Sequence, residues 1–151
     1  MFRVAAGTLL AALVASCGTI APAPGAELAR LDGQSLIVTL SVDKMAYSAG
    51  ETVVATLVVT NRTAAPVLLR FSTTQRYDFA ITDQAGNEVW RWGADMMFGQ
   101  AIGEETIEPG GRLTYPQRFR APALAGTYRL AGRFVAIGRD FAASADLAVT
   151  R

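Results

Sequence analysis

The stretch RFSTTQRYDFAITDQAGNEVWRWGADMMF, residues 70–98, contains both tryptophans of the 151-residue chain. Apolar and polar residues alternate over residues 77–81, which is the two-residue period of a half-buried strand. Residues 83–87 have the composition of a turn, and residues 89–92 return as a second apolar strand. The stretch therefore predicts an antiparallel hairpin that is followed by a loop with apolar residues at its tip.

Two turn geometries fit this hairpin, and they give different strand pairings. If the loop is residues 84–87, Ile81 faces Trp90 and Phe79 faces Trp92, so that apolar side chains meet on one face. This pairing buries no charge, and we adopt it. It predicts that four aromatic side chains form the structural core of the stretch: Tyr77, Phe79, Trp90 and Trp92.

The alternative is a type I turn that has Gly86 in the left-handed conformation and a bulge after it. The pairing then shifts by one residue, so that Phe79 faces Arg91 and both tryptophans turn to the opposite face. They would form an exposed aromatic platform there. In the adopted pairing, by contrast, Asp78 lies diagonal to Arg91 and close enough for an ion pair.

The loop after the hairpin, residues 93–103, is punctuated by glycine and has no strand period. It nevertheless carries several large apolar side chains. Such side chains in a loop either close the end of a core or face a partner. We expect the first, and the second stays open. In the second case, the contact residues are Asp95, Met96, Met97 and Phe98.

The rest of the chain repeats the strand period and shows no helical period after residue 33. Short strands with turn signals between them predict an all-β domain over residues 34–151, an antiparallel sandwich or barrel of about eight strands. Besides the hairpin, the expected strands are residues 35–42, 53–60, 67–71, 113–119, 128–134 and 145–149.

The N-terminus has the pattern of an export signal. A single basic residue, Arg3, precedes an apolar segment that is too short to span a membrane. The run Val-Ala-Ser-Cys at residues 14–17 resembles a bacterial lipobox, and this resemblance implies cleavage before Cys17 and attachment of lipid to it. We therefore expect an exported protein that is anchored by lipid to the cell membrane or the outer envelope.

Two short segments thus precede the domain. Residues 1–16 are the expected signal peptide of the lipoprotein. Residues 17–33 are rich in Ala, Pro and Gly and are expected to be a tether. A short helical turn within residues 27–31 is compatible with the sequence.

Composition excludes several classes of function. The chain has no histidine and one cysteine, which removes histidine-dependent nucleophilic enzymes and His-based or Cys-based zinc sites. Its formal net charge of +1 gives no reason to expect a nucleic-acid partner. The acids near the loop fit solvated turn and strand-end positions: Asp78, Asp83, Asp95, Glu104 and Glu105. We expect no enzyme, no cofactor and no metal.

The aromatic motifs resemble those of the BsuPI family of intracellular proteinase inhibitors over about residues 34–137. The most specific part is Gln-x-Tyr-Asp-Phe at residues 75–79, followed by Trp-Arg-Trp at 90–92 and Met-Phe at 97–98. Gly93 and Gly111 depart from the pattern, since serine and glutamate are usual there. The resemblance implies an immunoglobulin-like β-sandwich.

The same resemblance implies inhibition of a subtilisin-like serine proteinase. An inhibitor needs a rigid exposed loop that fills the proteinase cleft, and Met96, Met97 and Phe98 are its candidates. The expected partners are therefore a serine proteinase or another envelope protein, with the membrane reached through the N-terminal lipid. The alternative function is a non-catalytic envelope module that binds another protein or acts as a spacer.

Overall fold

The computed structural model describes residues 36–138 and 141–151, together with the backbone of residues 27–29. These residues form eleven strands and one 3₁₀ helix, which confirms the prediction of an all-β fold. The elements are β1 (Glu27–Ala29), β2 (Leu36–Val42), β3 (Ala46–Ser48), β4 (Thr52–Asn61), β5 (Val67–Phe71), β6 (Tyr77–Thr82), β7 (Glu88–Arg91), η1 (Trp92–Asp95), β8 (Gly103–Ile107), β9 (Arg112–Arg120), β10 (Gly126–Phe134) and β11 (Phe141–Thr150).

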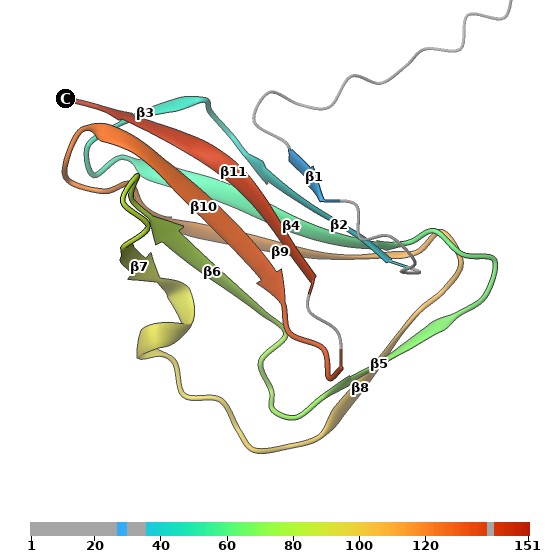
Figure 1. The fold of residues 1–151 in the computed structure, drawn as a ribbon. Helices are drawn as coiled ribbons and strands as arrows, with labels where there is room; N and C mark the ends of the chain where they lie inside the picture. Colours follow the sequence, from blue (N-terminus) through green and yellow to red (C-terminus); the bar gives the residue numbers. More distant parts are fainter. Residues whose placement is uncertain (1–26, 30–35, 139–140) are drawn as a thin grey trace, which may run out of the picture.

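Two sheets form a sandwich, with strand orders β1-β2-β4-β9 and β3-β11-β10-β6-β7 (Figure 1). All pairs in these sheets are antiparallel except β3 with β11, which is parallel. β5 and β8 pair as a separate two-stranded ribbon at one end of the molecule. The helix η1 and the loop after it lie beside β7, which is an edge strand of the five-stranded sheet.

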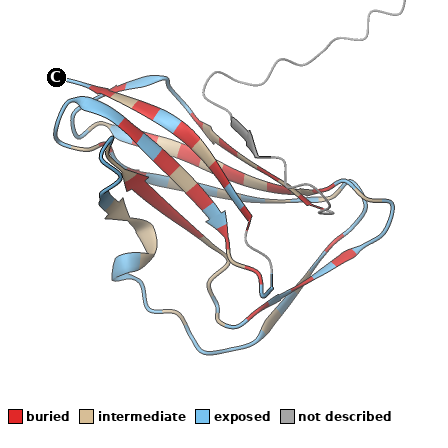
Figure 2. Cartoon of the chain, in the orientation of Figure 1, coloured by how far each residue is buried: buried red, intermediate tan, exposed pale blue. Residues whose placement is uncertain are grey.

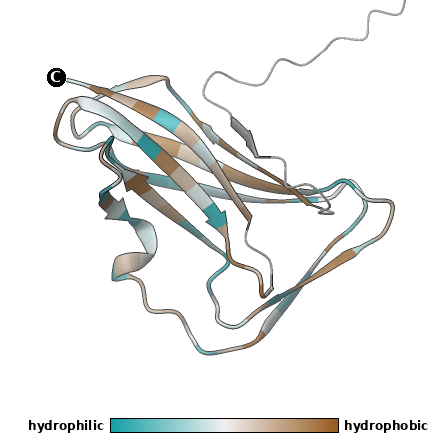
Figure 3. Ribbon diagram, in the orientation of Figure 1, coloured by the Kyte–Doolittle hydropathy of each residue, from teal (hydrophilic) through white to brown (hydrophobic). Residues whose placement is uncertain are grey.

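The core lies between the two sheets because alternate residues of each strand point inward. Buried and more exposed positions alternate along β2, β4 and β11, as the striped colouring of Figure 2 shows. Figure 3 shows the matching alternation of apolar and polar residues. The largest fully buried side chains include Phe71, Phe79, Phe134 and Phe141. The two-residue period of the sequence therefore accounts for the sandwich.

A tyrosine corner fixes the connection between β9 and β10. The hydroxyl of Tyr128, near the start of β10, donates a hydrogen bond to the carbonyl oxygen of Leu124 at 2.9 Å. A tyrosine bonded to the backbone a few residues upstream is a hallmark of immunoglobulin-like sandwiches. This local feature agrees with the class of sandwich that the resemblance implies.

Three strands were not predicted. β1 lies inside the segment that was expected to be a tether, at a position where a helical turn was also considered. It forms a strand that pairs with β2. β3 lies between the expected strands 35–42 and 53–60, and β8 lies at the end of the expected loop and continues beyond it. β1 and β3 are three residues long, and β8 has a single large apolar residue, so none shows a clear period. The rest of the tether and Cys17 lie outside the described residues.

The hairpin turn has the alternative geometry. Gly86 has a φ of 85°, and its N–H donates to the carbonyl oxygen of Asp83 at 3.1 Å, as in a type I turn followed by a left-handed glycine. The Asp83 N–H donates to the Asn87 carbonyl oxygen at 2.9 Å. Thr82 consequently pairs with Glu88, one residue out of the adopted register.

A second irregularity restores the adopted register. After Thr82, the next pair is Ile81 with Trp90, which leaves Val89 as an extra residue on β7. This bulge cancels the shift that the turn introduced, so the adopted pairing is confirmed beyond it. The expected pairing of Phe79 with Trp92 is wrong, because β7 ends at Arg91 and Trp92 begins η1.

The four residues of the predicted aromatic core lie at different depths in the sandwich. Phe79 is fully buried, whereas Tyr77, Trp90 and Trp92 are half-buried and pack against the core from its margin. Trp90 stacks on Phe119 of the opposite sheet, with ring centroids 4.6 Å apart. Trp90 therefore joins the two sheets at an edge of the sandwich.

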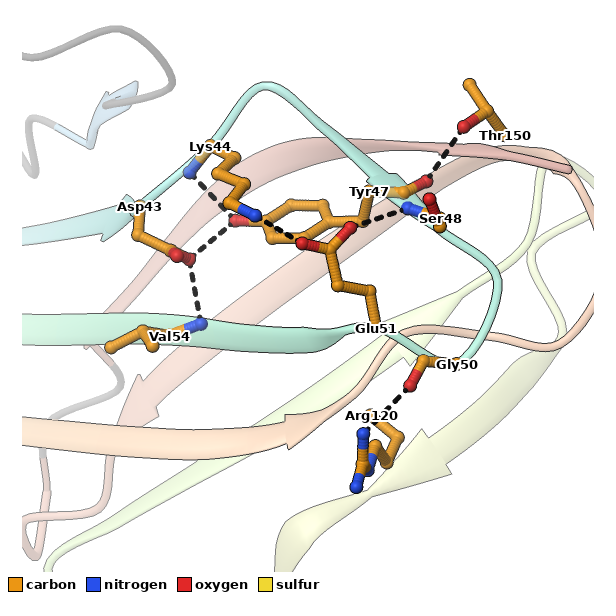
Figure 4. A network of polar contacts seen from close by, with 9 residues as sticks. All are labelled: Asp43, Lys44, Tyr47, Ser48, Gly50, Glu51, Val54, Arg120 and Thr150. Carbon is orange, nitrogen blue, oxygen red and sulfur yellow. Dashed lines mark hydrogen bonds and ion pairs between the residues drawn. The ribbon is translucent and has the colours of Figure 1, made fainter.

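A polar network fixes the chain between β2 and β4 (Figure 4). The buried ring of Tyr47 places its hydroxyl 2.8 Å from Asp43 Oδ1, to which it donates, while the Lys44 N–H donates to the same hydroxyl at 2.9 Å. Asp43 Oδ1 also accepts from the Val54 N–H at 2.8 Å. Lys44 forms an ion pair with Glu51. The Asp43 carboxylate thereby links β2, β3 and β4.

We expect this network to make stability depend on pH in the acid range. Burial alone would raise the pKa of Asp43, but hydrogen bonds from Val54 and Tyr47 outweigh it and hold that pKa below its ordinary 3.8. Because the pKa of Asp43 is lower in the folded state than in the unfolded state, its stabilising effect is fully present at a pH above the unfolded-state pKa. The effect is lost as the pH falls towards the folded-state pKa. Urea titrations should give a constant unfolding free energy down to about pH 5 and a decline below about pH 4.

The variant Asp43→Asn removes the titrating group. Its unfolding free energy should be lower than that of the wild type at neutral pH and should decline less steeply in acid. If the unfolding free energies of the two proteins fell equally steeply with pH below about pH 4, a stabilising role for the Asp43 carboxylate would be contradicted.

Candidate functional site

The candidate site is the segment Asp95–Phe98, here called the contact segment. β7 leads directly into η1, and the Met96 N–H donates to the Gly93 carbonyl oxygen at 3.3 Å to close the short helix. At Met96 the backbone becomes extended, with φ −100° and ψ 142°. The chain then stays outside both sheets until β8 begins (Figure 1).

Asp78 fixes the start of η1. Its carboxylate is largely buried and accepts three hydrogen bonds, from the N–H groups of Phe79 (2.9 Å) and Gly93 (3.0 Å) and from Arg91 Nη1 (2.7 Å). The expected ion pair with Arg91 is therefore confirmed. A Cβ at Gly93 would lie 3.0 Å from Asp78 Oδ1. The glycine that departs from the family pattern thus allows a close approach of backbone to carboxylate.

Arg91 lies between two carboxylates. It forms hydrogen bonds and an ion pair with Glu88 on β7 as well as the bond to Asp78 on β6. These partners, Glu88 first, raise the pKa of Arg91 further above its ordinary value, and Arg91 in turn lowers the pKa of Glu88. Arg91 and Glu88 are therefore both charged at neutral pH. The bond from Arg91 to Asp78 ties the end of β7 to β6.

Aromatic stacking holds both ends of the contact segment. Trp92 stacks on Tyr77 with ring centroids 4.6 Å apart, and Phe98 lies 5.8 Å from Trp92. Tyr77 also contacts Tyr115 of the opposite sheet at 4.8 Å. Burial raises the pKa of Tyr77 and of Tyr115, so both hydroxyls stay protonated at neutral pH. Phe98 is thereby attached to the sandwich through Trp92.

Two hydrogen bonds to Thr74 fix the chain directly after the segment. The Thr74 N–H donates to the Gly99 carbonyl oxygen at 2.9 Å, and the Gly99 N–H donates to Thr74 Oγ1 at 3.0 Å. Thr74 lies in the connection between β5 and β6, so a distant part of the chain holds the loop in place. The contact segment is therefore anchored on both sides.

Between these anchors the side chains point into solvent. The exposed fraction is 99% for Met97 and 47% for Met96, and Asp95 is also exposed. Ile102 further along the loop is 80% exposed. The expectation that the loop closes the end of the core is therefore wrong for both methionines and for Ile102. Phe98, in contrast, is half-buried, and its ring lies against Trp92.

Most of the acids near the loop are held by ion pairs or hydrogen bonds. Among the acids near the loop, Asp78, Glu104 and Glu105 pair with arginines, and Asp83 accepts from the Asn87 amides. Within residues 36–138 and 141–151, no group of three or more Asp, Glu or Cys residues is placed to hold a metal ion. No helix in the described part of the chain has the length and apolarity that crossing a membrane requires.

The fold and this site define an immunoglobulin-like β-sandwich that presents an anchored apolar loop. The sequence matches the BsuPI family model, described as intracellular proteinase inhibitor, over residues 40–138. This match covers more than half of the chain, so the chain belongs to the BsuPI family. No curated protein matches the sequence.

Solved structures share the fold at low identity. The sporulation control protein Spo0M from Bacillus subtilis is similar with a TM-score of 0.52 and 18% identity, over 78% of this chain and 50% of Spo0M. A cycloisomaltooligosaccharide glucanotransferase from Paenibacillus sp. is similar with a TM-score of 0.47 and 18% identity, over 74% of this chain and 13% of the enzyme. The chain thus spans half of the length of Spo0M, and this likeness concerns the fold alone.

The anchors of the segment were not predicted from the sequence. Asp78 was expected to pair with Arg91 but not to accept from Gly93. Thr74 and Gly99 were not singled out at all, because they are 25 positions apart and Gly99 takes part in their contact only through its backbone. The glycine at position 93 was the one usable signal, since a glycine where serine is usual indicates a close approach.

We expect Thr74→Val to loosen the contact segment without unfolding the domain. Valine keeps the shape of threonine but cannot accept the Gly99 N–H. Hydrogen exchange at the Gly99 amide should become about fivefold faster, while the global unfolding free energy changes by less than about 1 kcal/mol.

The matched control is Thr114→Val, at an exposed threonine of β9. It should leave exchange in the contact segment unchanged. Equal exchange at Gly99 in the wild type and Thr74→Val would show that this bond does not hold the segment.

Proposed function

We propose that this protein inhibits a subtilisin-like serine proteinase and that the contact segment enters the proteinase cleft. The observation that carries the proposal is the exposure of Met97 between two anchored ends. Met97 would occupy the specificity pocket, because such clefts accept large apolar side chains. Membership in the BsuPI family supports an inhibitor of proteinases as the class of function.

Anchoring matters because association costs conformational entropy. A loop that is already extended loses less freedom on binding, so more of the contact energy appears as affinity. The Asp78 bond to Gly93 and the Thr74 bonds to Gly99 hold the two sides of the segment. An extended segment can also pair its backbone with a strand of the partner, while its side chains enter pockets.

We further propose that a lipid on Cys17 tethers the inhibitor to the cell envelope. The lipobox-like run at residues 14–17 supports this, and Cys17 itself lies outside the described residues. An envelope-bound member of this family would meet exported proteinases, whereas the family description names an intracellular inhibitor.

The substitution Met97→Asp tests the proposed function. A carboxylate at this position would have to enter an apolar pocket, so the inhibition constant for subtilisin should rise at least about a hundredfold. Since Met97 is fully exposed, the melting temperature should change by no more than about 3 °C. The measurements are a proteolysis assay with a peptide substrate and a thermal denaturation curve.

The control is Leu124→Asp, which places the same charge at an exposed leucine of the β9–β10 connection. It should inhibit like the wild type. Absence of inhibition by wild-type protein at micromolar concentration would refute the proposed function and leave the envelope interaction module as the better account. Equal loss of inhibition in both variants would refute the assignment of the contact to Met97.

A further inference from the structure

Two adjacent methionines lie in the contact segment, and both are exposed to solvent. The chain has four methionines, and the structure describes three of them. Met97 is 99% exposed, Met45 is 66% exposed and Met96 is 47% exposed. The thioether of Met97 is therefore open to solutes from all sides. Met45 lies between β2 and β3, outside the contact segment.

We propose that Met97 is a modification site, at which a peroxide forms methionine sulfoxide and thereby turns off the contact segment. The proposal rests on the proposed function. The sulfur lone pair attacks one peroxide oxygen, the S–O bond forms and the O–O bond breaks. With hydrogen peroxide, sulfur loses two electrons and the other oxygen leaves as hydroxide, which takes the proton of the transferred hydroxyl group to give water.

Oxidation at this position leaves the fold intact. The groups that anchor the segment are Asp78 with Gly93, Trp92 with Phe98, and Thr74 with Gly99; the side chain of Met97 takes part in none of these contacts. The sulfoxide is itself solvated in the free protein. The modification therefore acts on recognition and not on stability.

The effect on binding follows from the polarity of the sulfoxide. A sulfoxide that enters an apolar specificity pocket leaves its oxygen without a hydrogen-bond donor. We expect the inhibition constant to rise roughly ten- to a hundredfold. The change is reversible, because a methionine sulfoxide reductase returns the thioether when two thiols are oxidised to a disulfide and the oxygen leaves as water.

The test uses the purified full-length chain and dilute hydrogen peroxide, which is removed before each assay. Samples are taken over time, the sulfoxide at each methionine is quantified by peptide mass spectrometry, and the inhibition constant for subtilisin is measured. Loss of inhibition should follow the rate at which Met97 is oxidised, and not the rate at Met45 or Met96. Treatment with the reductase and dithiothreitol should restore inhibition.

Two variants serve as controls. For each variant, the inhibition constant for subtilisin after peroxide treatment is divided by the constant before treatment. The ratio should stay near one for Met97→Leu, which has no thioether at this position. It should match the wild-type ratio for Met45→Leu. A melting temperature that is unchanged by oxidation separates lost recognition from unfolding.

The outcomes distinguish this inference from the proposed function. If the untreated wild type does not inhibit, the proposed function fails and the inference fails with it. If the untreated protein inhibits and full oxidation of Met97 leaves the inhibition constant unchanged, only the inference is overturned. If peroxide treatment weakened inhibition by Met97→Leu as much as inhibition by the wild type, the inference would also be overturned.

Discussion

The carboxylate of Asp78 is the contact on which the candidate site depends. It is largely buried on β6, and it accepts hydrogen bonds from its own strand, from Arg91 at the end of β7 and from the backbone of Gly93 in η1. A buried carboxylate without these donors would be strongly unfavourable, so the three elements are fixed together. The direction in which the chain leaves β7 follows from this contact, and with it the position of the contact segment.

The exposed methionines contrast with a sandwich that buries most of its large apolar residues. The core is complete without them, and Phe98 packs on Trp92 while Met97 makes no equivalent contact. Anchors on both sides hold the segment away from the core, although its composition would allow it to collapse onto apolar surface. An exposed apolar segment that is anchored at both ends is suited to binding, and this supports a recognition role for the loop.

The fold was predictable because the two-residue period of the long strands directly reflects which side of a sheet is buried. The short strands β1 and β3 and the polar strand β8 escaped prediction because they carry too few apolar residues to show that period. The turn at Gly86 and the bulge at Val89 cancel each other, so the expected pairing of Ile81 with Trp90 holds although the turn geometry differs. No local sequence signal distinguished an apolar loop that fills a core from one that is held open by distant partners such as Thr74.

We propose that the contact segment is the surface that meets the proteinase. Hydrogen exchange of the wild-type protein, free and mixed with excess catalytically inactive subtilisin, tests it directly. We expect slower exchange on complex formation at the amides of residues 95–99, with little change in β2, β4 and β11. Slower exchange confined to another surface, such as the ribbon of β5 and β8 or the edge strand β9, would contradict it.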